Sequence, residues 1–203
     1  MTGLLADRIA ARLSAHGLVA SDAAVAGLAA YLQQLSRWNE RVNLTAIPLG
    51  PSPSDQAIDK LLVEPVLATT LLDATPRTWF DLGTGGGSPA IPLRCLWRAG
   101  TLRMVESREK KGAFLREVVR QLGLAGTSVS TCRFDDLGEA RSVDLVTLRA
   151  VRVDSELVAL LDRLLSMRGQ VLAFGSAILD DAFVCQAQAT LPDGSSLNLY
   201  GRL

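Results

Sequence analysis

The sequence predicts a doubly wound α/β sheet with a helical N-terminal extension and a terminal antiparallel hairpin. Three observations support this fold: residues 1–72 have helical periodicity, short apolar runs then alternate with amphipathic stretches, and two last runs flank the turn Pro192-Asp-Gly194. Alternating strands and helices favour parallel pairing through right-handed crossovers. We therefore expect an extension over residues 1–72 and a sheet domain over residues 73–203.

Three helices are predicted in the extension. The first lies within residues 1–20, the second follows an N-cap at Ser21 or Asp22, and the third runs from about Asp55 to Leu72. Pro65 should bend the third helix or mark a break in it.

Seven strands and three helices are predicted in the sheet domain. One helix follows the first strand, and the other two span residues 110–122 and 155–165. The strands span residues 78–82, 101–106, 128–132, 143–148, 170–174, 183–191 and 195–200.

Composition excludes several classes of protein. Lys+Arg and Asp+Glu both number 21, so the chain as a whole is not a strongly basic nucleic-acid binder, although cations gather in residues 94–120. Three scattered cysteines and a single histidine exclude a zinc site and a disulfide framework. No apolar stretch approaches the roughly 20 residues of a membrane span. We expect a cytoplasmic protein, monomeric and without metal or membrane.

The glycine-rich segment Phe80–Ala90 is the part of the sequence that points most clearly to a functional site. It follows a predicted strand and opens a helix, with Ser88 as the expected N-cap and Pro89 in the first helical position. Glycines at 83, 85 and 87 let the backbone approach a ligand closely near a helix N-terminus. Such a loop predicts a nucleotide-like cofactor.

Two cofactor classes use such a loop. The dinucleotide pattern G-x-G-x-x-G would require a third glycine at 88, where Ser88 stands. The spacing present, acid-x-G-x-G-x-G from Asp81, resembles the first motif of class I S-adenosylmethionine-dependent methyltransferases. Glu106, after the next strand, could hold a ribose in either class. The terminal hairpin favours the methyltransferase, and a nicotinamide oxidoreductase remains an alternative.

Four motifs together resemble one methyltransferase family. This family comprises the small-subunit (16S) rRNA guanine-N7 methyltransferases of the glucose-inhibited division protein B type, and the resemblance covers roughly residues 28–175. The motifs are Trp38-Asn39-x-x-x-Asn43-Leu-Thr-Ala-Ile47, Asp81-x-Gly-Thr-Gly-x-Gly-x-Pro89, Lys111-x-x-Phe114-Leu115 and Leu148-Arg149-Ala150. The first motif is specific to the family, whereas the glycine loop alone is not.

The resemblance implies an S-adenosylmethionine site. Within it, Glu106 would hold the ribose, Asp135 would accept the adenine amino group, and Phe134 would give a backbone or stacking contact. The full set of implied cofactor residues is Asp81, Gly83, Gly85, Gly87, Ser88, Glu106, Phe134, Asp135 and Arg149.

The resemblance also implies the acceptor, N7 of one guanine in small-subunit rRNA. Guanine N7 carries a free lone pair, so its methylation needs no general base. Arg149 and Arg133 would act as catalytic residues by holding the acceptor base or its phosphate.

The chain departs from the family's pattern on the expected acceptor side. Gln56 stands where the family has histidine, Asp59-Lys60 replaces Asp-Ser, and Phe174 replaces the lysine that usually ends the fifth strand. Two alternatives follow. The chain could methylate another RNA or a small molecule, or it could be a non-catalytic RNA-binding protein on the same fold.

Overall fold

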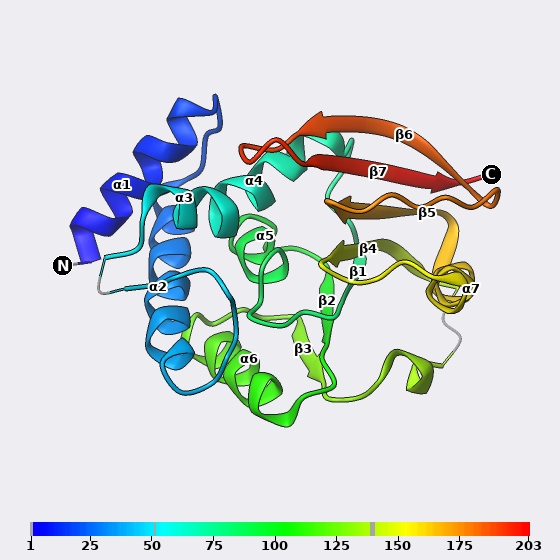
Figure 1. Ribbon diagram of the computed structural model, residues 1–203, viewed down its shortest axis with the longest axis horizontal. Helices are drawn as coiled ribbons and strands as arrows, with labels where there is room; N and C mark the ends of the chain where they lie inside the picture. Colours follow the sequence, from blue (N-terminus) through cyan, green and yellow to red (C-terminus); the bar gives the residue numbers. More distant parts are fainter. Residues whose placement is uncertain (1, 51, 139–140) are drawn as a thin grey trace.

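The computed structural model describes residues 2–50, 52–138 and 141–203, and its N-terminal extension is helical (Figure 1). Ser21 caps the second helix as predicted, because its side chain accepts the N–H of Ala24 at 3.2 Å. The helical segments of the extension are α1 (Thr2–Ala15), α2 (Asp22–Asn39), α3 (Asp55–Ile58), the π-helical turn η1 (Asp59–Val63), α4 (Glu64–Ala68) and the 3₁₀ turn η2 (Thr69–Leu71).

A seven-stranded sheet forms the rest of the fold, in the order β3-β2-β1-β4-β5-β7-β6. The first five strands are parallel, and β7 is antiparallel to both β5 and β6. This confirms the predicted doubly wound sheet with a terminal hairpin. The strands are β1 (Thr78–Leu82), β2 (Thr101–Val105), β3 (Thr127–Ser130), β4 (Val143–Arg149), β5 (Leu165–Phe174), β6 (Phe183–Thr190) and β7 (Ser196–Arg202).

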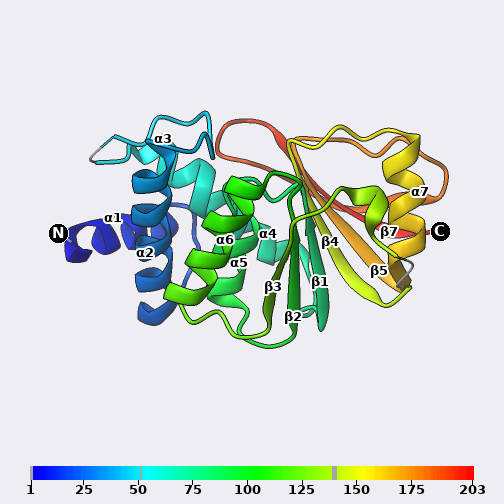
Figure 2. The same cartoon turned by 90° about the horizontal axis from the view of Figure 1, so that it is seen from below.

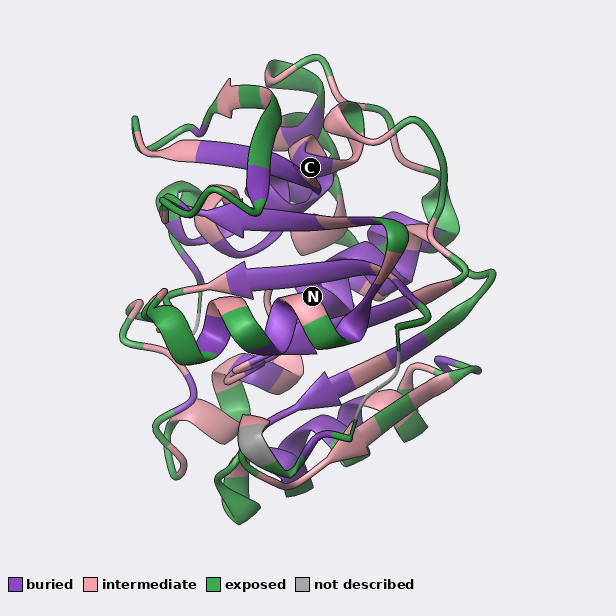
Figure 3. Ribbon diagram, turned by 90° about the vertical axis from the view of Figure 1, so that its right-hand side faces the viewer, coloured by how far each residue is buried: buried purple, intermediate pink, exposed green. Residues whose placement is uncertain are grey.

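Helices cover both faces of the sheet (Figure 2). On one face lie α5 (Ala90–Leu96), α6 (Glu109–Gln121) and the extension, and on the other lies α7 (Ser155–Leu164). One apolar core joins the extension to α5 and α6, and a second lies under α7, so the middle strands are buried (Figure 3). Across the described ranges, no helix has the length and apolar character needed to cross a bilayer.

Two segments differ from the sequence prediction. β5 begins at Leu165, directly after α7, rather than at residue 170. The helical run from Asp55 is continuous, but it widens into the π-helical turn η1 just before Pro65. A proline has no N–H for the carbonyl four residues earlier, here that of Leu61, so the expected break takes the form of a change in helical winding.

The order of the strands fixes where a ligand can bind. β1 lies between β2 and β4, so the winding of the sheet reverses between β1 and β4. Open α/β sheets bind ligands at the carboxyl ends of the strands beside such a reversal. Leu82 of β1 is in register with Leu148 of β4, which sets the glycine loop beside Arg149.

Arg94 is a structural cation rather than part of a basic surface. Its side chain is buried and donates from Nη1 to the carbonyls of Trp97 and Ala99 at 3.0 and 2.7 Å. Its Nη2 donates to the carbonyls of Gly100, at 3.2 Å, and Ala125. One guanidinium therefore ties the end of α5 to the loops that precede β2 and β3.

We expect Arg94→Met to lower the free energy of unfolding by about 2–4 kcal/mol, because it leaves several carbonyls without a donor. Urea denaturation measures this loss. Arg98→Met, at an exposed position nearby, should change stability by less than about 0.5 kcal/mol. Equal stabilities for the two variants would contradict the structural role of Arg94.

Asp81 is a buried carboxylate on β1. The hydroxyl of Thr147 on β4 donates to its Oδ1, and the same hydroxyl accepts the indole N–H of Trp79 at 3.1 Å. Its Oδ2 is buried without a hydrogen-bond partner. Burial raises the pKa of Asp81 to about 7, against the opposing effects of its hydrogen bonds and of Arg149.

Asp81 makes stability depend on pH. The unfolded chain loses this proton near pH 4 and the folded chain near pH 7, so its contribution to stability is lost as pH rises between these values. We expect the wild type to lose up to about 2–4 kcal/mol relative to Asp81→Asn between pH 4.5 and pH 8. Urea denaturation of both proteins across this range tests it, and parallel pH profiles would contradict it.

Candidate active site

The loop after β1 turns on three glycines with positive φ. Gly83, Gly85 and Gly87 have φ of 71°, 59° and 94°, backbone angles that residues with a side chain rarely adopt. A Cβ at Gly83 would lie 2.8 Å from Val151, and one at Gly87 would lie 2.5 Å from Ile91. A Cβ at Gly85 would meet nothing nearer than 3.7 Å. The middle glycine therefore has no close neighbour that excludes a side chain, and it lines a cavity.

Glu106 holds this loop against the end of β2. Its Oε2 accepts the N–H of Gly85 and its Oε1 accepts the N–H of Arg108, both at 2.9 Å. The residue is buried, and the two amides fix its orientation. Each carboxylate oxygen keeps a further lone pair, so Glu106 can still accept hydrogen bonds from the two hydroxyls of a ribose.

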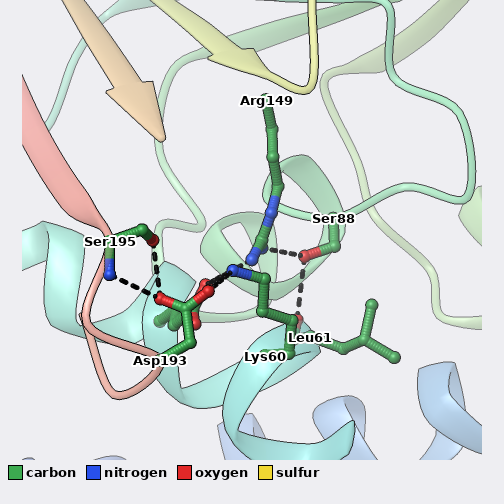
Figure 4. A network of polar contacts seen from close by, with 7 residues as sticks. Lys60, Leu61, Ser88, Arg149, Asp193 and Ser195 are labelled. Carbon is green, nitrogen blue, oxygen red and sulfur yellow. Dashed lines mark hydrogen bonds and ion pairs between the residues drawn. The ribbon is translucent and has the colours of Figure 1, made fainter. Parts of the chain in front are cut away.

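Arg149, at the end of β4, is held on three sides. It forms an ion pair with Glu64 of the extension, and its Nη1 donates to Oγ of Ser88 at 3.1 Å (Figure 4). Its guanidinium carbon lies 5.2 Å from the centre of the Phe174 ring. The side chains of Arg149 and Glu64 are only 14% and 1% exposed. Burial raises the pKa of Glu64, an effect that Arg149 opposes.

Ser88 links Arg149 to the extension and does not cap α5. The helix begins at Ala90, with Pro89 in the cap position, so the predicted N-cap at Ser88 is wrong. The Ser88 hydroxyl instead donates to the carbonyl of Leu61 at 2.9 Å. Pro65 leaves this carbonyl without its ordinary helical donor, and Ser88 supplies one.

Residues 44–47 cross over the glycine loop. Oδ1 of Asn39 accepts the N–H groups of Leu44 and Thr45 at 2.9 and 3.0 Å, and the hydroxyl of Thr45 accepts the N–H of Ile47 at 3.1 Å, so Asn39 and Thr45 together hold this turn. Tyr31 is buried, and its hydroxyl donates to the carbonyl of Gly86 at 2.7 Å. The motif that begins at Trp38 therefore builds one wall of the site.

A cavity of about 400 Å³, which we call the central cavity, lies among these groups. It brings together five of the predicted residues: Gly83, Gly85, Ser88, Glu106 and Arg149. Lys60 and Lys111 also line it, and neither was predicted as a site residue. The sequence does mark both of them, since Lys111 belongs to a family motif and Lys60 departs from the family's pattern on the expected acceptor side.

A second cavity, of about 360 Å³, contains Arg133 and Phe134 at the end of β3. Gly83 lies close to both cavities, because a Cβ there would be 3.5 Å from Cζ of Phe134. Arg133 is exposed, and the structure does not bring it to the central cavity with Arg149. The backbone of Asp135 belongs to the 3₁₀ turn η3 (Phe134–Asp136), but its side chain lies outside the described part of the structure.

Two further predicted residues lie outside both cavities. Asp81 and Gly87 are buried and do not line either cavity. In the parts of the chain that the structure describes, His, Cys, Asp and Glu side chains form no group of three that could hold a metal ion.

Comparison with known sequences identifies relatives over most of the chain. Residues 24–198 match the family model described as rRNA small subunit methyltransferase G. The protein of that name from Xylella fastidiosa is 39% identical over 153 residues, 75% of this chain and 69% of its own length. The one from Nitratidesulfovibrio vulgaris is 34% identical over 190 residues, which is 91% of this chain and 83% of the relative's length. For Syntrophotalea carbinolica, 34% identity extends over 65% of the relative's length.

Solved structures confirm the fold independently. A methyltransferase from Geobacter sulfurreducens superimposes with a TM-score of 0.59 over 97% of this chain and 98% of its own, at 15% identity. An O-methyltransferase from Klebsiella pneumoniae, described as putative, superimposes with a TM-score of 0.58 over 85% of this chain and 89% of its own, at 16% identity. The predicted class I methyltransferase fold is thus confirmed. With the family match, these findings show that the chain belongs to the rRNA small subunit methyltransferase G family of S-adenosylmethionine-dependent enzymes.

Proposed function

We propose that this chain methylates N7 of a guanine in 16S rRNA of the small ribosomal subunit. The observation that carries the proposal is the convergence of the glycine loop, Glu106 and Arg149 on one cavity, in a chain of this family. Relatives over most of its length are named as small-subunit rRNA methyltransferases. The proposal places it in the cytoplasm, acting as a monomer.

The residues present fit S-adenosylmethionine. Glu106 is oriented by two backbone amides and would hold the ribose hydroxyls. Gly85 leaves room where a side chain would otherwise stand, and Asp81 keeps a buried, unpartnered oxygen below the loop that suits a nearby cationic group. Gly83, Gly87 and Ser88 would shape the loop around the methionine part.

The second cavity suits the adenine ring. Phe134 offers an aromatic surface beside Gly83, and Asp135 would accept the amino group. Arg133, exposed at the same cavity, would hold a phosphate of the RNA. The two cavities together would accommodate the two ends of one elongated ligand.

The chain's own contribution to the reaction is positioning. When bound, S-adenosylmethionine supplies a methyl group activated by a sulfonium centre. Guanine N7 presents a lone pair, so no side chain has to remove a proton. Arg149 is immobilised by Glu64, Ser88 and Phe174, and it would form a rigid wall against which the reactants align. The segment 44–47, folded over the loop, would limit the access of water.

We expect radiolabelled methyl transfer to small-subunit rRNA that lacks the modification, with the label at N7 of one guanine. Arg149→Ala should lower kcat/KM by about 100-fold or more, because it removes a fixed wall of the site. Arg168→Met, an exposed change early in β5, serves as the matched loss of charge and should match the wild type. S-adenosylhomocysteine binding without label in the wild type would show that the acceptor is a different molecule.

A further inference from the structure

A third cavity, of about 800 Å³, adjoins the central cavity. Its walls come from the extension and from the turn between β6 and β7, at Pro192 and Asp193. The two cavities share Ala46, Ile47 and Lys60 as lining residues. Lys60 therefore stands at the junction between the central cavity, which suits the cofactor, and the third cavity.

The ammonium group of Lys60 is held between two carboxylates. It forms an ion pair with Asp193 and lies 3.3 Å from Oε2 of Glu64 (Figure 4). Asp193 is fixed in turn, because its Oδ1 accepts the N–H and the hydroxyl of Ser195 at 3.0 and 2.6 Å. An ammonium has three N–H donors, and two carboxylates leave one of them for a ligand.

The other cations near this junction are less well placed to contact a molecule that spans it. Arg149 is engaged by Glu64, Ser88 and Phe174. Arg12, which also lines the third cavity, donates from two nitrogens to the carboxylate of Asp59. Lys111 lines the central cavity but not the third one. Lys60 is therefore the cation best placed to contact a molecule that spans the junction.

We propose that the third cavity receives the acceptor base and that Lys60 recognises O6 of the guanine. This inference rests on the proposed function. N7 has to face the central cavity to react, and O6 lies beside N7 on the same edge of the base, so O6 also faces the junction. Adenine presents an amino donor in place of O6, which would meet another donor in Lys60.

The two carboxylates complete the arrangement. When the N7 lone pair bonds to the methyl carbon, the carbon–sulfur bond breaks, the sulfur becomes a neutral thioether and the positive charge passes to the imidazole ring of the base. Glu64 and Asp193, which already flank Lys60, would stabilise that charge. The same cluster would thus select the base and favour the charge that develops on it.

A chemical substitution in the RNA tests this contact. Small-subunit rRNA is prepared with either guanine or 2-aminopurine at the acceptor position, because 2-aminopurine keeps N7 and lacks O6. We expect the wild type to prefer guanine by about 10–100-fold in kcat/KM, since a hydrogen-bonding site rejects a base that lacks its partner. Lys60→Met should lose activity on guanine by a similar factor and show little further loss on 2-aminopurine.

Binding and control measurements separate this role from a structural one. S-adenosylhomocysteine affinity, measured by calorimetry, should stay within about twofold of the wild type in Lys60→Met, and Lys60→Arg should restore part of the preference for guanine. Arg168→Met should retain the full preference. Full preference for guanine in Lys60→Met, or a parallel loss of S-adenosylhomocysteine binding, would overturn the proposal for Lys60 alone. A wild type that binds S-adenosylhomocysteine but labels neither RNA would overturn the rRNA acceptor and this inference with it.

Discussion

The buried ion pair between Glu64 and Arg149 holds the site together. Glu64 belongs to the helical extension and Arg149 ends β4, so the pair joins the two parts of the chain at the point where the winding of the sheet reverses. A carboxylate as buried as Glu64 is tolerated only with a partner, and removing one member of such a pair costs about 3–5 kcal/mol. The ion pair therefore fixes both the position of the extension and the orientation of Arg149, and the walls of the central cavity depend on both.

A proline contributes to the same arrangement without any polar group of its own. Pro65 follows Glu64 directly, and its missing N–H leaves the carbonyl of Leu61 for the hydroxyl of Ser88. Ser88 in turn accepts from Arg149. The π-helical turn η1 that precedes the proline also carries Lys60, so one irregular stretch of helix supplies contacts to the glycine loop, to β4 and to the hairpin turn.

The sequence predicted local features well and long-range ones poorly. Strand 78–82 was placed correctly because an apolar run meets a glycine loop, and the N-cap at Ser21 was found from local chemistry. The glycine loop, Glu106 and Arg149 were identified as neighbours through spacing and family resemblance. The junction at Lys60 depends on its ion pair with Asp193, 133 positions away, and the contact of Arg94 with Ala125 joins positions 31 apart; no local pattern encodes either contact. Ser88 looked like a cap because its sequence context suits one, but the fold gives its hydroxyl two other partners.

The contact between Lys60 and Asp193 has a consequence for biosynthesis. The two residues lie 133 positions apart, and Asp193 sits in the turn of the last hairpin, outside the five parallel strands. During translation those five strands and their helices emerge first and carry most residues of the two buried cores, which Leu197, Leu199 and Tyr200 of the last hairpin complete. The residues of the glycine loop and their partners are therefore synthesised before the turn that completes the wall of the third cavity. In each new copy, the segments proposed to hold the cofactor precede the turn that closes the proposed compartment for the base.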